Sequence, residues 1–321
     1  MTVRVSICIP TYNMGRYIGL AVESALKQSF ADVEVLVCDN ASTDETSKVL
    51  ASFQDKRLKI VRHPENIGMI SNFNKTIELS TAPLIKFLEA DDLLEVDCVA
   101  HMVAMMDRYP RVGVVSVGRT LIDAEGSVLG KHSKSQTEVV DGKVLLARLR
   151  RMGNEVGTPT DVMVRRILLQ EVGAFDPAYQ TYLNDWDLWI RCAERTEFGF
   201  VGECLTRVRR HTGQVGWVGS RTNLEVDVTH LMLKKRWGDA PFLSSKWLQG
   251  LLLTLHFSEE HVWRGIRGLI WGGQVGVSRV DIFRRLAGHL GLLKSLMVVV
   301  YVVLHLPARL GARLMSRVLN R

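Results

Sequence analysis

The amino-acid sequence predicts an α/β fold around a mostly parallel central sheet. In the first third of the chain, short apolar runs of strand length alternate with segments whose apolar residues recur at helical spacing. This order requires crossover connections, which make neighbouring strands parallel. Polar clusters follow three of the predicted strands, and parallel sheets bind ligands at the carboxyl ends of their strands. The length of 321 residues allows one large domain with an appendage.

The predicted elements follow one another with short connections. Strands are expected at 3–9, 33–38, 58–61 and 84–88, with helices between them at 18–26, 42–53 and 70–77. Ser42 and Glu45 have the spacing of a capping box for the second of these helices. The expected elements after them are a helix at 96–109, a strand at 112–117, a hairpin turn at 123–126, a helix capped by Asp141, a strand at 161–164 and an aromatic helix from residue 184.

Net charge is unevenly distributed along the chain. The whole sequence carries +7, but residues 261–321 hold ten Lys or Arg against a single acid, Asp281. The remainder is therefore slightly acidic, which argues against a catalytic face that binds nucleic acid. The five cysteines form no C-x-x-C pair, and nothing before the first strand resembles a signal peptide. We therefore expect reduced thiols and a catalytic body on the cytoplasmic side of the membrane.

The fourth predicted strand ends in three acids, Glu89, Asp91 and Asp92. Adjacent like charges repel each other, and a divalent cation removes that penalty. Mg²⁺ and Mn²⁺ are typically held by one or two protein carboxylates, while substrate phosphates fill further positions. The pattern therefore predicts a metal site that receives a phosphorylated ligand. The alternative is that Asp91 or Asp92 caps a helix that starts near Leu93.

The chain resembles the inverting glycosyltransferases of family two, of the bacterial surface-polysaccharide type, which have the GT-A fold. The resemblance rests on five pieces that occur in the family's order and span about two thirds of the chain. They are residues 6–13 (SICIPTYN), 39–44 (DNASTD), 66–68 (NIG), 88–92 (LEADD) and 185–189 (DWDLW). The family pattern gives no guidance beyond about residue 236. We expect a GT-A domain at 1–236 and a helical C-terminal extension at 237–321.

The resemblance also implies roles for individual residues. The nucleotide of a nucleotide-sugar donor would contact Pro10, Thr11, Tyr12, Asn13, Asp39, Asn66, Gly68 and Asp91. A divalent cation, Mn²⁺ or Mg²⁺, would be held by Asp91, Asp92 and His211, and Asp185 would be the catalytic base. Glu89 stands where Asp is commoner in the family, so we do not assign it to the metal.

Each of these residues also has a purely structural interpretation. Asp185 could be a helix N-cap, and Asp39 could end its strand in an Asx-turn. Asn66 and Gly68 could form only a turn, and His211 could be an ordinary surface histidine. Two further sets stay open in the same way. Diphosphate contacts or plain surface charges are the alternatives for Lys86, Arg165 and Arg166, and core residues or a sugar-stacking face for Trp186 and Trp189.

The residues suit a single displacement that inverts the anomeric carbon. Asp185 would act as general base, and the cation would stabilise the leaving nucleoside diphosphate. The donor is expected to be a UDP-sugar and the acceptor a hydroxyl of a glycan or a lipid-linked molecule. A nucleotidyltransferase is an alternative, but the loop after the first strand lacks the Gly-rich, basic sequence that holds a triphosphate. A catalytically dead sugar-nucleotide-binding scaffold is another, and the intact acids argue against it.

The C-terminal extension combines apolar and basic patterns. An apolar run at 290–306 is interrupted by Lys294, at the short limit for a spanning helix. Arginines then recur every fourth residue at 309, 313, 317 and 321. A basic stripe beside an apolar one is typical of a helix lying on anionic lipid. We expect peripheral attachment to the inner face of the cell membrane. The alternative is a helical hairpin that packs on itself or forms an oligomer, and the oligomeric state stays open.

Overall fold

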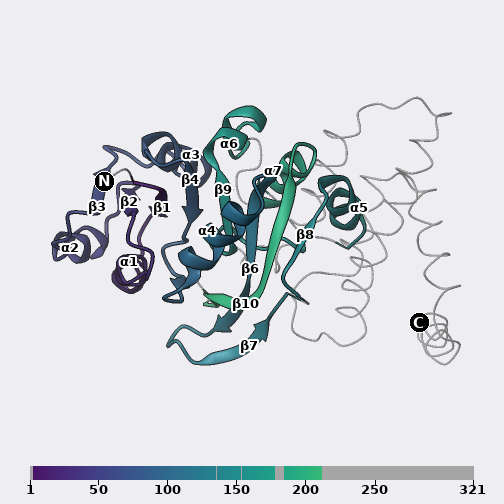
Figure 1. Cartoon of the computed structure of the whole chain (residues 1–321). Helices are drawn as coiled ribbons and strands as arrows, with labels where there is room; N and C mark the ends of the chain where they lie inside the picture. Colours follow the sequence, from purple (N-terminus) through teal and green to yellow (C-terminus); the bar gives the residue numbers. More distant parts are fainter. Residues whose placement is uncertain (1–2, 135, 153, 178–183, 212–321) are drawn as a thin grey trace, which may run out of the picture. The chain divides into compact units, whose positions relative to one another are not determined.

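The computed structural model describes residues 3–134, 136–152, 154–177 and 184–211 (Figure 1). Within them the predicted α/β fold is confirmed as a ten-stranded sheet with flanking helices. No helix in this described part is both long and apolar enough to cross a bilayer. The boundary at 236/237, the extension at 237–321 and its membrane contact all lie outside the described residues, so these remain predictions.

The sheet is mostly parallel in its first half and mixed in its second. Its strands lie in the order β3-β2-β1-β4-β9-β6-β10-β5, with β7 paired to β6 and β8 paired to β10. Their bounds are β1 Val5–Thr11, β2 Val33–Asp39, β3 Leu58–Arg62, β4 Leu84–Phe87, β5 Leu93–Leu94, β6 Val112–Ile122, β7 Val128–His132, β8 Glu138–Val140, β9 Val162–Arg165 and β10 Glu197–Arg209. Strands β1 to β4 run parallel, whereas β9 is inserted antiparallel between β4 and β6.

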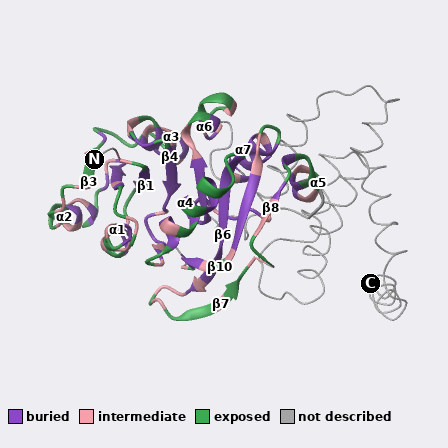
Figure 2. Cartoon of the chain, viewed as in Figure 1, coloured by how far each residue is buried: buried purple, intermediate pink, exposed green. Residues whose placement is uncertain are grey.

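Helices cover both faces of the sheet. Successive side chains of a strand point to opposite faces, so each face has apolar side chains to bury. Val5, Ile7 and Ile9 of β1 belong to the main apolar core together with buried residues of α1 and α4. The intervening Cys8 lies on the other face, where its Sγ approaches the carbonyl of Thr76 in α3. The helical bounds are α1 Ile18–Leu26, α2 Thr46–Ala51, α3 Met69–Leu79, α4 Cys98–Arg108, α5 Gly142–Met152, the 3-10 turn η1 Pro159–Asp161, α6 Arg166–Val172 and α7 Asn184–Ala193. Figure 2 shows the central strands buried and β7 exposed at its edge.

The helix expected near Leu93 begins later, at Cys98. Leu93 and Leu94 instead form the short strand β5, which pairs antiparallel with Arg207 and Thr206 of β10. A pairing partner more than a hundred residues away therefore overrides the local helix-start signal. The interpretation of Asp91 or Asp92 as a helix cap was wrong.

The predicted capping box at Ser42 and Glu45 is also wrong. Helix α2 begins at Thr46, whose backbone N–H bonds to Asp44 Oδ1 at 3.0 Å. Ser42 Oγ accepts a hydrogen bond from the backbone N–H of Asn13 at 2.9 Å instead. The cap expected at Asp141 is confirmed, since its Oδ1 accepts the N–H of Lys143 at 2.9 Å.

Candidate active site at the carboxyl ends of the strands

The predicted nucleotide residues of the first strand lie at the carboxyl end of β1. Thr11 is paired with Asp39 at the end of β2, so the two predicted contacts are neighbours. Among the described residues, the buried Thr11 Oγ1 has no hydrogen-bond partner. Tyr12 directly after it is 42% exposed, while Pro10 is buried within β1. An exposed ring beside a buried unsatisfied hydroxyl fits a ligand-binding edge.

Asp39 is held firmly by its own neighbours. Its Oδ1 accepts the N–H of Ser42 at 2.9 Å, and its Oδ2 accepts from Ser47 Oγ at 2.9 Å and from Arg62. Burial alone would raise the pKa of Asp39, but these hydrogen bonds and the Arg62 charge hold it below its ordinary value. Asp39 is therefore a fixed carboxylate. The bond from Ser42 N–H comes from three residues on, one more than in an Asx-turn, so the structure does not show the Asx-turn that was the structural alternative.

Asn66 and Gly68 form a turn that is tied to the end of β2. Gly68 has φ +86°, and its N–H bonds to Asn66 Oδ1 at 2.9 Å. Asn40 next to Asp39 donates to the same oxygen at 2.8 Å and accepts from Ile67 N–H. The structure thus explains this turn without a ligand. Its predicted role in nucleotide binding stays a prediction.

The acids after β4 occupy different environments. Asp92 is 1% exposed; its two oxygens accept hydrogen bonds from Arg209 N–H at 2.8 Å and Thr160 Oγ1 at 2.6 Å. Burial raises its pKa, and the neighbouring Asp91 and Glu89 raise it further. Asp91 Oδ2 lies 3.0 Å from His211 Nε2. The predicted pair Asp91 and His211 is therefore brought together, and Asp92 is held by Arg209 N–H and Thr160 Oγ1. The predicted metal role of Asp92 stays a prediction.

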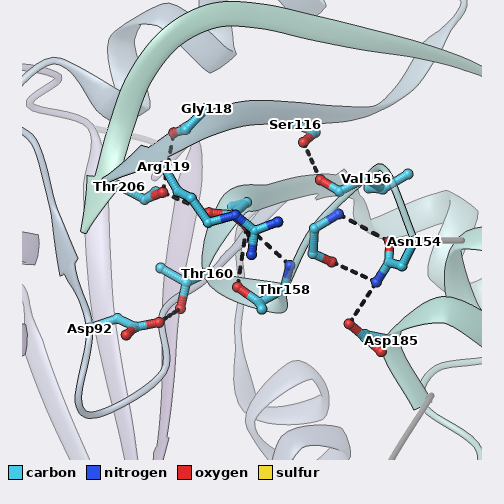
Figure 3. Close-up of polar contacts among 12 residues, drawn as sticks. Asp92, Ser116, Gly118, Arg119, Asn154, Val156, Thr158, Thr160, Asp185 and Thr206 are labelled. Carbon is cyan, nitrogen blue, oxygen red and sulfur yellow. Dashed lines mark hydrogen bonds and ion pairs between the residues drawn. The ribbon is translucent and has the colours of Figure 1, made fainter. Parts of the chain in front are cut away.

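Asp185 lies in the first turn of α7 with both carboxylate oxygens engaged. Oδ1 accepts the N–H of Trp186 at 2.7 Å, and Oδ2 accepts from Asn154 Nδ2 at 2.9 Å (Figure 3). Burial raises the pKa of Asp185 to about 6, opposed by these two bonds and by the charge of Arg119. Asn154 is itself fixed, because its carboxamide donates to Gly157 O and accepts from Gly157 N–H, both at 3.1 Å.

Glu89 has a pKa that is shifted by the charges of both Asp91 and Asp185. Burial and the charges of Asp91, Asp185 and Asp161 together raise its pKa to about 8. Asp91 and Asp185, the predicted metal ligand and the predicted base, are therefore both among the charges that act on Glu89. In the view of Figure 3, Arg119 lies between Asp92 on one side and Asp185 on the other.

Sequence reasoning missed the segment around η1, which joins these acids. Thr160 Oγ1 donates to Asp92 and accepts the N–H of Glu89 at 3.0 Å. Asp161 is fully buried, accepts from Thr206 Oγ1 at 2.6 Å and lies 3.2 Å from Arg119. Only Pro159 and the glycine two residues before it signalled a turn here. Nothing local signalled its contacts with acids about seventy residues earlier.

The three basic residues that had been considered for diphosphate contact are structural. Lys86 is fully buried and donates to the carbonyl of Thr160. Arg165 bonds to the carbonyls of Val112 and Met106. Arg166 bonds to the carbonyls of Ile77 in α3 and of Ala82 just before β4. They hold the strand β9 against its neighbours. The diphosphate assignment of these residues was wrong.

The two tryptophans of α7 are core residues. Trp189 is fully buried and donates from Nε1 to Gly157 O at 3.0 Å, and Trp186 is 8% exposed. Neither offers an open face to a sugar. The alternative that they form a stacking surface is therefore excluded.

The residues of the site fit a divalent cation that is held partly by substrate. The described part of the chain contains no preformed cage of three or more His, Cys, Asp or Glu side chains. It does bring one carboxylate oxygen of Asp91 to within 3.0 Å of one imidazole nitrogen of His211. Both atoms are ordinary ligands of Mn²⁺, and two protein ligands plus phosphate oxygens are a common arrangement for such ions.

The model of the family described as "Glycosyl transferase family 2" matches residues 6–173. An uncharacterized glycosyltransferase of Rickettsia prowazekii is 27% identical over 217 residues, covering 65% of this chain and 65% of that protein. The chondroitin synthase of Escherichia coli is 35% identical over 127 residues, covering 39% of this chain and 18% of the synthase. This chain therefore spans about two thirds or less of these relatives' length.

Solved structures resemble the fold. Residues 1–349 of S. aureus TarS in complex with UDP-GlcNAc align with a TM-score of 0.62 and 17% identity, covering 96% of this chain and 83% of that one. The mannosyltransferase PcManGT of Pyrobaculum calidifontis in complex with GDP-Man and Mn²⁺ aligns with a TM-score of 0.56 and 17% identity, covering 94% and 88%. At this identity the likeness concerns the fold, and it confirms the predicted GT-A architecture.

Proposed function

Because residues 6–173, more than half of the chain, match its model, this chain belongs to glycosyl transferase family 2, and from this we propose a single-displacement sugar transfer with inversion. The donor is a sugar linked to a nucleoside diphosphate, with UDP as the first candidate. The acceptor is a hydroxyl of a glycan or a lipid-linked molecule. The observations that carry the proposal are the pair Asp91 and His211, 3.0 Å apart, and the buried carboxylate of Asp185, which Asn154 holds at 2.9 Å.

Asp185 is the general base of the proposed reaction. It takes the proton of the acceptor hydroxyl while the acceptor oxygen forms its bond to the anomeric carbon. The bond from that carbon to the diphosphate oxygen breaks in the same step, so the configuration inverts. A pKa near 6 leaves Asp185 mostly ionised at neutral pH yet more basic than an ordinary Asp, as general-base catalysis requires.

Asp91 and His211 form the other end of the proposed site. A divalent cation held there would supply Lewis-acid stabilisation of the leaving diphosphate. Asp92 keeps this end in place through its bonds to Arg209 N–H and Thr160 Oγ1. The hydroxyl of Thr11 and the exposed ring of Tyr12 are the proposed contacts for the nucleoside. S. aureus TarS has been solved in complex with UDP and with UDP-GlcNAc, which supports UDP as the first nucleotide to test.

Thermal stabilisation tests the donor site directly. UDP, GDP and dTDP are each added with and without Mn²⁺ to the full chain and to Asp91→Asn. A ligand at a hundredfold excess over its Kd stabilises the fold by about 2.7 kcal/mol, so the melting temperature should rise by several degrees. We expect the rise with UDP to need Mn²⁺ and to be lost in Asp91→Asn. Asp97→Asn, an exposed acid six residues on, is the matched control. If no diphosphate shifts the wild type with Mn²⁺, the proposal fails.

Attachment to a membrane is part of the same proposal and rests on the sequence of the extension. The arginines at 309, 313, 317 and 321 suggest a surface helix on anionic lipid. Such a position would bring the site to a lipid-linked acceptor. Sedimentation of the full chain with anionic and with neutral vesicles tests this. Binding to anionic vesicles at low salt that weakens at high salt is expected, and a chain that ignores them would contradict the proposal.

A further inference from the structure

A buried arginine lies next to the proposed metal pair. Arg209 is 2% exposed and ends β10 two residues before His211. Its Nε donates to the main-chain carbonyl of Asp91 at 2.8 Å, and its Nη1 donates to the carbonyls of Asp123 and Ala124 at 3.0 and 3.1 Å. A guanidinium presents a rigid, planar fork of donors, so these bonds fix its plane. Arg209 therefore ties the loop that carries Asp91 to the hairpin between β6 and β7.

The same guanidinium lies over the ring of Tyr17. Arg209 Cζ is 4.7 Å from the ring centroid, a distance at which a cation is attracted to the electron-rich face of the ring. This attraction is stronger when the cation is removed from water, as Arg209 is. Tyr17 itself is 7% exposed, directly precedes α1 and bonds through its backbone N–H to Met14 O at 2.9 Å. Arg209 thus holds the ring of Tyr17 as well as the main chain of Asp91.

Tyr17 in turn contacts the imidazole of His211. The two ring centroids are 5.1 Å apart and the ring planes are tilted by 43°, which is within the range of favourable ring pairs. The main chain beside His211 is held to β6, because Arg210 N–H bonds to Ile122 O at 2.8 Å. In the described part of the chain, the directional contacts of the imidazole itself are Asp91 at 3.0 Å and the ring of Tyr17.

A bound cation would replace the first of these two contacts. Asp91 Oδ2 and His211 Nε2 would both be ligands, so bonds to the ion would take the place of the hydrogen bond between them. The contact with Tyr17 is a ring contact and does not occupy Nε2. Groups that orient a metal-ligating histidine change metal affinity by about 10–100-fold when they are mutated. The ring of Tyr17 lies where such a group is needed.

We propose that Tyr17 and Arg209 are positioning residues for the metal site. The ring of Tyr17 orients the imidazole of His211, and Arg209 fixes that ring. Arg209 also fixes the main chain of Asp91, so one side chain sets the positions of both ligands. Loss of this arrangement weakens metal binding and leaves the chemical step intact once the site is filled. This inference rests on the proposed transferase function, with its cation at Asp91 and His211.

Titration of the full chain with Mn²⁺ at saturating UDP tests the inference, with free Mn²⁺ measured from its electron paramagnetic resonance signal. Tyr17→Leu removes the ring and keeps an apolar side chain, so we expect the Kd of Mn²⁺ to rise about three- to tenfold. Tyr17→Phe keeps the ring and should bind Mn²⁺ like the wild type. Tyr109→Leu is the matched control and should leave the Kd unchanged. Arg108 lies over the ring of Tyr109 at 5.4 Å, but Tyr109 precedes β6, whose first residue pairs with the start of β10 and not with its end.

Turnover provides a readout that a purely structural role would not move. At saturating Mn²⁺ the kcat of Tyr17→Leu should equal that of the wild type, whereas the Mn²⁺ concentration for half-maximal rate should rise together with the Kd. Arg209→Lys keeps the charge but loses the fork of donors, and it should also raise the Kd of Mn²⁺. The Tyr17 variants decide the question alone if Arg209→Lys does not fold.

The possible failures of this inference differ from those of the proposed function. An unchanged Kd in Tyr17→Leu or in folded Arg209→Lys, an equal rise in Tyr17→Phe, or a loss of kcat that Mn²⁺ does not restore would overturn the inference and leave the metal site standing. A lower melting temperature with an unchanged Kd would assign these residues to the fold alone and overturn it as well. A wild type that binds no Mn²⁺ in the presence of UDP would overturn the proposed function itself.

Discussion

Replacing Asn154 by Ala is expected to move the acid limb of the pH–rate profile to higher pH without abolishing turnover. Burial raises the pKa of Asp185 to about 6, and the bonds from Trp186 and Asn154 and the charge of Arg119 keep it from rising further. A general base works only when it is deprotonated. Turnover of the wild type should therefore fall tenfold per pH unit below about pH 6.

The magnitude follows from the bond that is lost. Asn154 Nδ2 donates to Asp185 Oδ2 at 2.9 Å and favours the ionised form. A hydrogen bond to a charged group contributes about 1.5–3 kcal/mol, and one pKa unit corresponds to 1.36 kcal/mol. We expect a rise of about one unit, which reduces the ionised fraction at pH 7 from about nine tenths to about one half. Any further loss that is equal at all pH values reports misplacement of the carboxylate, which costs about 10²-fold per ångström.

The assay is the initial rate of nucleotide release between pH 5 and 9 at saturating donor and acceptor. Asn154→Asp places a second carboxylate beside Asp185 and should raise its pKa more than Ala does. Asn74→Ala is the matched control. The Asn74 carboxamide donates to the Phe175 carbonyl at 2.8 Å and accepts from the Phe175 N–H at 3.0 Å, and it makes no bond to Asp185. Asn74→Ala should leave the acid limb of the pH–rate profile at the same pH. An unmoved limb in Asn154→Ala, or a limb near pH 6 that persists in Asp185→Asn, would refute the assignment.

Three further changes test other parts of the site and fold. Asp91→Asn and His211→Ala should each raise the Mn²⁺ concentration for half-maximal turnover at least tenfold, read from a metal titration; an unchanged midpoint would remove that residue from the metal site. Gly157→Ala should destabilise the fold by about 2–3 kcal/mol in urea denaturation, because φ is +114° and the new Cβ would lie 2.4 Å from Oδ2 of Asp161. Gly130→Ala is the control: its Cβ meets no atom within 4 Å, so its free energy of unfolding should be nearly unchanged. Glu89→Gln should raise the melting temperature at pH 8 more than at pH 5. The folded pKa of about 8 lies above the unfolded value, so the wild type loses stability as pH rises between the two; a pH-independent difference would contradict this.

The sequence predicted the strand ends of the site well because they are local features. Apolar runs that stop at polar residues gave the ends of β1, β2 and β4 to within two residues, and parallel pairing then required that they meet. The pair Asp91 and His211 came from the resemblance, since nothing local relates two residues 120 positions apart. The structure brings their side chains to 3.0 Å.

Contacts between distant segments limited the rest of the prediction. The helix expected at 96–109 begins within two residues of α4, but the alternative of a helix start near Leu93 was wrong, because Leu93 pairs with a strand that begins a hundred residues later. Asn154 lies in an irregular loop, and only the folded chain shows that its carboxamide reaches Asp185. Arg119 sits within an otherwise apolar strand and gave no periodic signal. Its partner Asp161 looked like the first residue of a strand. Residues that position a catalytic group are hard to identify in one sequence, because their role depends on packing and not on local pattern.

Lys86 shows how the fold and the acidic site depend on each other. A buried ammonium is costly, and burial lowers the pKa of Lys86, while Asp161, Asp92 and Glu89 oppose that change. The positive charge of Lys86 also offsets the repulsion among these acids. It is tied to Thr160 O, while the hydroxyl of Thr160 bonds to Asp92. The antiparallel insertion of β9 next to β4 makes this possible, because it delivers η1 to the strand end that carries the acids. The position of one strand therefore determines both how the buried charge is balanced and where the acidic centre forms.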